Sequence, residues 1–168
     1  MRLPIVMRPA QREHLPAIRA INAESVPGVS LLTARDLNRI TEAASIVVVA
    51  LLNENVAGSS VGYAADAAYA GEEFQWFLCR GRDFLYVDQI AVAVSHRSRG
   101  IGAALYQELA QFAERNQLRS LVCEVNVEPP NPRSMAFHAR QGFDEVGRLL
   151  TTDGRYVALL QRRGQAPQ

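Results

Sequence analysis

Apolar residues recur along this chain at two spacings, one typical of helices and one typical of strands. The clearest helical pattern has gaps of four, four and three positions, at Ile101, Leu105, Leu109 and Phe112. This spacing places the four side chains on one face and predicts an amphipathic helix. Residues 46–52 instead form a continuous, mostly β-branched run, which predicts a buried strand.

The same reasoning, extended along the chain, predicts an alternation of strands and helices. Strands are expected at residues 5–8, 46–52, 56–64, 83–94, 121–127, 143–151 and 155–162, and helices at 13–25, 33–44, 102–116 and 131–141. Residues 65–82 show no clear period, so we predict a long loop there.

The order of these elements predicts the fold class. A strand, a helix and a further strand follow one another between residues 83 and 127, which implies a parallel pair, whereas the hairpins are antiparallel. We therefore expect one α/β domain over residues 1–162, with a mixed, twisted sheet of about seven strands and about four flanking helices. Residues 163–168 are expected to form a frayed tail.

Composition narrows the classes of function. The formal net charge is +1, from 18 basic and 17 acidic residues, which gives no general electrostatic reason to bind nucleic acid or anionic lipid. The two cysteines, Cys79 and Cys123, lie in no cluster with metal-ligand spacing, so no metal site is expected.

The sequence shows no membrane or secretion signal. No run approaches the ~18 apolar residues of a membrane span, and the N-terminus lacks the pattern of a secretory signal. We expect a cytoplasmic protein; a homodimer is left open.

The segment from residue 94 to residue 102 carries the most specific chemistry. Gly100 and Gly102 let the backbone turn tightly and approach a ligand, and the following helix directs its unpaired amides toward negative charge. Arg97 and Arg99 add charge-assisted contacts that suit phosphate oxygens. The segment therefore predicts a diphosphate site.

Two common nucleotide motifs do not fit this segment. A Walker loop needs Lys and then Ser or Thr after its second glycine, where Ala103 and Ala104 stand. A dinucleotide-binding loop needs a third glycine where Leu105 stands.

The segment resembles the signature of the GNAT superfamily of acyl-CoA-dependent N-acyltransferases. That signature, Gln/Arg-x-x-Gly-x-Gly/Ala between a strand and a helix, is matched by Arg97, Gly100 and Gly102. The resemblance extends through Asn131 to residues 137–143, which are similar to the family's closing aromatic-Tyr-x-x-x-Gly-Phe.

The resemblance implies direct transfer of an acetyl group from acetyl-CoA to a primary amine of a small molecule or peptide, without a metal. It also implies a bulge that splays two parallel strands around a slot for the cofactor. Backbone groups of two strand residues would pair with the pantetheine arm, the loop amides would hold the diphosphate, and an asparagine would reach the pantetheine. The expected cofactor-binding residues are Val92, Val94, Arg97, Arg99, Gly100, Ile101, Gly102, Ala103 and Asn131.

The catalytic residues are less clearly marked. His138 stands where the resemblance implies a tyrosine that protonates the departing CoA thiolate, and an imidazolium can act as an acid near neutral pH. The alternative is that His138 is a hydrogen-bonded helix residue without a catalytic role, and that Tyr106 or Tyr86 is the acid. Asp88 is a candidate base because a buried carboxylate has a raised pKa, although pairing with an arginine would also explain it. Glu124, on the neighbouring strand, is the second candidate base.

Two questions stay open at this level. Residues 72–77 combine two acids with three aromatic rings, and either cover the acceptor or pack their rings onto the sheet. The absence of the motif tyrosine also leaves room for a CoA-binding sensor or structural module that performs no turnover. The identity of the amine acceptor has no recognisable pattern in the sequence.

Overall fold

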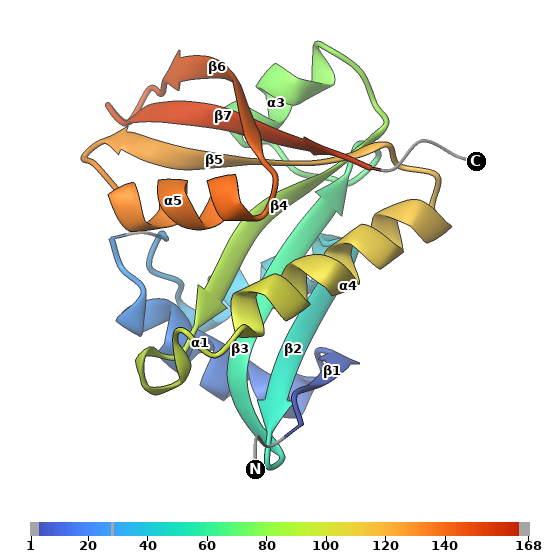
Figure 1. Cartoon of the computed structure of the whole chain (residues 1–168), viewed down its shortest axis with the longest axis vertical. Coiled ribbons are helices and arrows are strands. Elements are labelled where there is room, and N and C mark those ends of the chain that lie inside the picture. Colours follow the sequence, from blue (N-terminus) through green and yellow to red (C-terminus); the bar gives the residue numbers. More distant parts are fainter. Residues whose placement is uncertain (1–3, 28, 165–168) are drawn as a thin grey trace.

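The computed structural model describes residues 4–27 and 29–164, which form one mixed sheet with helices on both faces (Figure 1). In this part of the chain the sheet has seven strands in the order β1-β2-β3-β4-β5-β7-β6. Their bounds are β1 Val6–Pro9, β2 Ile46–Leu52, β3 Asn55–Ala64, β4 Phe84–Val92, β5 Ser120–Glu128, β6 Asp144–Leu150 and β7 Tyr156–Arg163. The predicted α/β class and mixed sheet are confirmed.

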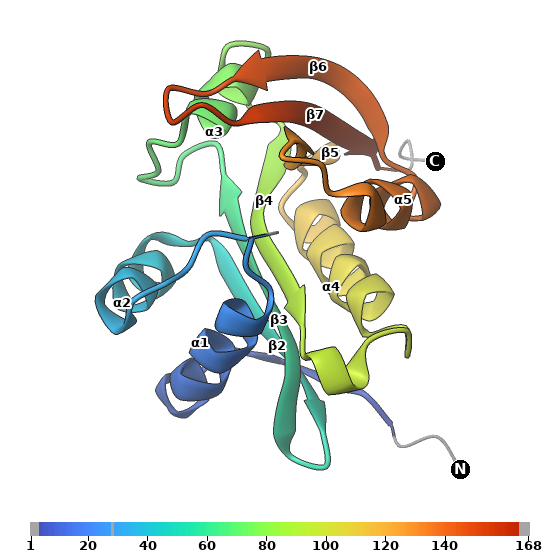
Figure 2. The same cartoon turned by 90° about the vertical axis from the view of Figure 1, so that its left-hand side faces the viewer.

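Five α-helices and two short 3-10 helices cover the sheet in the described ranges. The α-helices are α1 Leu15–Glu24, α2 Ala34–Ala43, α3 Glu72–Leu78, α4 Ile101–Arg115 and α5 Pro132–Arg140, and the 3-10 helices are Arg12–His14 and Val94–His96. Figure 2 shows α1, α2 and α3 on one face and α4 and α5 on the other. The apolar face predicted for α4 is buried at Ile101, Leu105 and Leu109 against the strands.

The two central strands, β4 and β5, pair in parallel for only three positions, from Phe84 opposite Ser120 to Tyr86 opposite Val122. Beyond Tyr86 they diverge, although both strands continue, and this splay is visible in Figure 1. The register of β4 on β3 shifts at the same point, and Asp88 falls at this irregularity without a partner residue on β3. A bulge increases local twist and bends its strand, which explains the divergence.

The prediction of a loop over residues 65–82 is wrong, because α3 lies within it. Phe74 and Phe77 of this helix are buried against Phe84 and Tyr86. A helix of seven residues is too short to show a period of its own. Its stability comes from tertiary packing of aromatic rings rather than from local propensity.

Smaller differences lie at element ends. The strand expected to reach residue 94 ends at Val92, and a 3-10 helix follows it. Strand β7 extends to Arg163, one residue into the predicted tail, whereas residues 165–168 lie outside the described part of the chain. Within residues 4–27 and 29–164, no helix combines the length and the apolar character needed to cross a membrane.

Candidate active site

Two adjoining cavities open where β4 and β5 diverge. One, of about 1170 Å³, is lined by acidic side chains from α2, α3, β4 and β5 and by four tyrosines, and we call it the acidic cavity. The other, of about 660 Å³, is bounded by the loop before α4 and by α5, and we call it the glycine-loop cavity. The residues that line both are Pro27, Val29, Ile90, Asn126, Ser134 and His138. The two cavities therefore adjoin each other along these residues.

The glycine-loop cavity presents free backbone amides at the start of α4. Ser98 and Gly100 both have positive φ, 60° and 84°, and this left-handed bend turns the chain into the helix. The first backbone hydrogen bond of the helix is donated by the Ala104 amide to the Gly100 carbonyl oxygen. In the described part of the chain, no protein oxygen accepts a hydrogen bond from the amides of residues 98–103. These N–H groups, at the positive end of a 15-residue helix, are available to a diphosphate.

Gly102 also serves the packing of α4 on α5. A Cβ at this position would lie 2.8 Å from Cζ of Phe137, closer than such atoms approach. A side chain at the second glycine of the motif would therefore force the ring of Phe137 to shift.

Most of the residues expected to contact the cofactor line this cavity. Those that do are Val92, Arg97, Gly100, Ile101, Gly102, Ala103 and Asn131. Asn131 additionally accepts a hydrogen bond from the Ser134 amide at 3.2 Å, which caps α5.

Val94 and Arg99 do not line the cavity. The Val94 amide donates instead to the carboxylate of Glu24 at 3.0 Å, so its N–H is already occupied. Two further arginines, Arg133 and Arg140, line the cavity from α5 and were missed in the sequence. Their spacing of seven, which places them on one face of the helix that begins at Pro132, is the signal that would have found them.

The acidic cavity holds both candidate bases, each bonded to a tyrosine. The Tyr86 hydroxyl donates to Glu124 at 2.6 Å, and the Tyr69 hydroxyl donates to Asp88 at 2.7 Å. Burial raises the pKa of Glu124 to about 8, with the negative charge of Glu73 adding to the effect. Burial also raises the pKa of Asp88. A carboxyl group with a pKa near working pH is suited to accept a proton from an ammonium group.

A third acid completes this wall. Glu73, on α3, is only 6% exposed and accepts a hydrogen bond from Arg155 at 2.9 Å. Arg155 also pairs with Asp153 at 2.9 Å, so its charge is shared between two carboxylates. The rings of residues 72–77 therefore pack on the sheet, as one of the two alternatives had it, and Glu73 lines the cavity. That the segment covers the acceptor stays a prediction. Tyr69 and Arg155 had no sequence signal, because they come from irregular segments that only the fold brings here.

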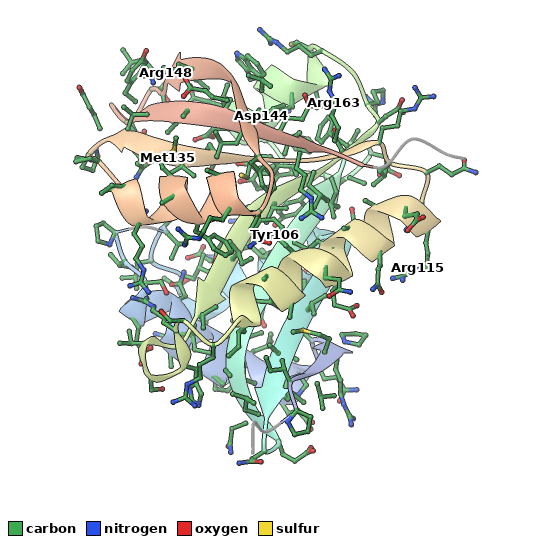
Figure 3. The ribbon with its side chains drawn as sticks, viewed as in Figure 1. Tyr106, Arg115, Met135, Asp144, Arg148 and Arg163 are labelled. Carbon is green, nitrogen blue, oxygen red and sulfur yellow. The ribbon has the colours of Figure 1, made fainter. Side chains whose placement is uncertain are left out.

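His138 is buried, and both nitrogens of its ring are occupied. Nδ1 lies 2.8 Å from the Ser134 carbonyl oxygen, which can only accept, so Nδ1 carries the proton. Nε2 lies 2.7 Å from the Tyr106 hydroxyl, which points from α4 toward α5 (Figure 3). Burial lowers the pKa of His138, which favours the neutral ring, with Nε2 accepting from Tyr106. The neutral ring has no free N–H to offer a thiolate.

This geometry makes a direct spectroscopic prediction for His138. We expect the ¹⁵N and ¹H shifts of its ring at pH 7 to be those of the neutral Nδ1–H tautomer, with a titration midpoint below the ordinary value of 6.5. His96, which is only partly buried, serves as the comparison in the same spectra. A midpoint above 6.5 for His138 would contradict this assignment and favour the imidazolium as the acid.

Comparison with protein families identifies the fold and the class. The model of the acetyltransferase (GNAT) family matches residues 15–143, which is most of the chain and includes the glycine loop, both candidate bases and α5. The chain belongs to the GNAT acetyltransferase family. The resemblance noted on Arg97, Gly100 and Gly102 is thereby confirmed, with His138 as the departure from the motif.

Solved GNAT structures share this fold over nearly their whole length. Ard1 from Thermoplasma volcanium superposes with a TM-score of 0.78 at 17% identity, covering 96% of this chain and 99% of that one. The ribosomal-protein-alanine N-acetyltransferase from Brucella melitensis gives 0.70 at 24% identity, with coverages of 94% and 99%. The structure of yncA from Salmonella typhimurium with its cofactor acetyl-CoA gives 0.70 at 16% identity, with coverages of 98% and 98%. No curated protein sequence shows significant similarity to the chain.

Proposed function

We propose that this GNAT protein transfers an acetyl group directly from acetyl-CoA to a primary amine of a small molecule or peptide. The observation that carries the proposal is that the cavity with the free helix amides meets the cavity with the raised-pKa carboxyl groups at residues lining both. In the proposal, the diphosphate binds the amides of residues 98–103 and Arg97, and the pantetheine arm follows Val92 toward Asn131.

In this proposal Glu124 is the base. It takes one proton from the acceptor's ammonium group, and the neutral amine then attacks the thioester carbonyl carbon. The new C–N bond forms as the C–O double bond opens to an oxyanion, which a free strand amide beyond Tyr86 stabilises. Collapse of this intermediate breaks the C–S bond, and the thiolate takes a proton from an acid of the site. The second proton of the nitrogen restores that acid, and Glu124 releases its own proton to solvent.

The donor of the thiolate's proton comes from the pair formed by His138 and Tyr106. His138 serves only in its imidazolium form, which burial disfavours. The Tyr106 hydroxyl carries a proton in its ordinary state, but donates it to Nε2 of His138, so it serves only when that hydrogen bond is broken. We retain both as candidates for this step; both line the acidic cavity.

The test is acceptor-dependent consumption of acetyl-CoA. The protein is mixed with acetyl-CoA and a panel of amines, and loss of the thioester absorbance is followed, since exposed Cys79 would react with a thiol reagent. All 18 basic residues of the chain are arginines, so no lysine side chain can act as an internal acceptor. Turnover that requires an added amine supports the proposal. Tight binding of acetyl-CoA without amine-dependent turnover would overturn it in favour of a CoA-binding sensor.

We place this reaction in the cytoplasm. Cys79 and Cys123 are both free in the structure, and an exposed free thiol such as that of Cys79 suits a reducing compartment.

A further inference from the structure

The acidic cavity contains more carboxyl groups than an acetyltransfer base requires. Its carboxyl groups are those of Asp36, Glu42, Glu73, Asp88 and Glu124, against the guanidinium groups of Arg39 and Arg155. Arg155 is already paired with Glu73 and with Asp153. Arg39 lies on α2 beside Asp36 and Glu42, toward the outer part of the wall. The inner carboxyl groups, Asp88 and Glu124, form no ion pair within the described residues.

One of these two inner carboxyl groups is not needed for proton transfer. If Glu124 is the base, Asp88 is a second carboxyl group set into the same wall at the β4 bulge. Its Oδ1 accepts from Tyr69, and in the described part of the chain no donor is bonded to Oδ2. Asp88 is half-buried, and withdrawing a carboxylate even partly from water without a positive partner is costly. A charged ligand group beside Asp88 would offset this cost.

Aromatic rings lie beside Asp88 in an arrangement that also favours a cation. The rings of Tyr63 and Tyr69 stack with centroids 4.3 Å apart, and Tyr86 lies 5.7 Å from Tyr69. All three tyrosines line the acidic cavity. An ammonium group next to a carboxylate and near aromatic rings gains from both ion pairing and cation–π attraction.

We propose that the acceptor is a small di- or polyamine, with one amine at Glu124 and a second amine, protonated as an ammonium group, at Asp88 beside Tyr69. This inference rests on the proposed acetyltransfer and names its acceptor class. Acceptors that carry a carboxylate are disfavoured, because that group would face Glu73, Asp88 and Glu124.

The experiment compares acceptors that differ only at the end remote from the reacting amine. Putrescine, butylamine and γ-aminobutyrate, together with their longer homologues, present an ammonium, a methyl and a carboxylate group at that end. At the best chain length we expect kcat/KM for the diamine to exceed that for the monoamine about tenfold or more. A hydrogen bond between charged groups, here the remote ammonium and Asp88, contributes about that factor. The carboxylate series should be poorest. The diamine preference should grow as pH rises, because Asp88 must lose its proton to pair, and burial raises the pKa of that carboxyl.

The matched variants are Asp88→Asn and Asp83→Asn. The asparagine of the first variant would keep an oxygen for the Tyr69 hydroxyl but lose the charge, so the preference for diamine over monoamine should fall to about onefold. Asp83, an exposed residue directly before β4, should leave that preference as it is when it is replaced. The panel on the unmodified protein decides the matter even if Asp88→Asn does not fold.

The failures of the two proposals are distinguishable. Turnover of butylamine as efficient as that of every diamine would overturn the diamine inference and leave acetyltransfer standing. A peptide N-terminus accepted better than all the small amines would also overturn it. No turnover with any amine, despite acetyl-CoA binding, would overturn the proposed function itself.

Discussion

Replacing Glu124 with glutamine is expected to lower kcat by about 10²-fold or more and to leave the Kd for acetyl-CoA within about twofold. A positioned general base contributes about 10²–10⁴-fold to rate, and glutamine keeps the shape and the hydrogen bond from Tyr86 while losing basicity. Steady-state kinetics and calorimetry measure the two effects. Glu128→Gln, at the exposed end of the same strand, is the control and should change neither quantity.

The unmodified protein and Glu124→Gln should also differ in how their rates depend on pH. The carboxylate form of Glu124 is the active one, so the rate with unmodified protein should rise with pH through about 8. In Glu124→Gln this limb should be absent.

Stability should show the opposite trend with pH. The pKa of Glu124 rises from 4.5 to about 8 on folding, so the folded state binds the proton more tightly than the unfolded chain. The contribution of Glu124 protonation to the free energy of unfolding is complete below about pH 4.5 and is lost as pH rises through about 8.

For the rate profile, a rise through about pH 8 that persists in Glu124→Gln would show that another group is the base.

Reversing the charge of Arg97 is expected to weaken acetyl-CoA binding on the order of 10²-fold, whereas the same change at Arg99 should alter it only a few-fold. Arg97 is half-buried and lines the glycine-loop cavity, while Arg99 is exposed and does not. A glutamate at position 97 removes a charge-assisted contact and adds repulsion to a diphosphate. Calorimetry with Arg97→Glu and Arg99→Glu measures the difference.

Folding must be checked in both variants, because Nε of Arg97 also donates to the Val92 carbonyl at 3.2 Å. Equal thermal midpoints would show that the loss of affinity is not a loss of structure. Gly102→Glu is a poorer probe, since its side chain would also collide with Phe137. Unchanged affinity in Arg97→Glu would contradict the assignment of this loop to the diphosphate.

Much of the fold was predicted because its signals are local. The spacing of Ile101, Leu105 and Leu109 predicts that α4 has one buried face, and the apolar run at residues 46–52 predicts that β2 is buried. The structure has both features. Both follow from the periods of helix and strand, which neighbouring residues alone define. Helix α3 was missed for the converse reason, since Phe74 and Phe77 acquire their helical packing from strands that the local sequence does not contain.

The sequence by itself determined the glycine loop, because left-handed backbone at Gly100 and free amides at a helix start are properties of adjacent residues. Only the tertiary structure decided the chemistry of the acidic cavity. Glu73, Asp88 and Glu124 come from α3, β4 and β5, and their shared wall exists because β4 and β5 diverge after Tyr86. A carboxyl group's pKa depends on which charges and how much protein surround it, and those surroundings are assembled across long sequence separations.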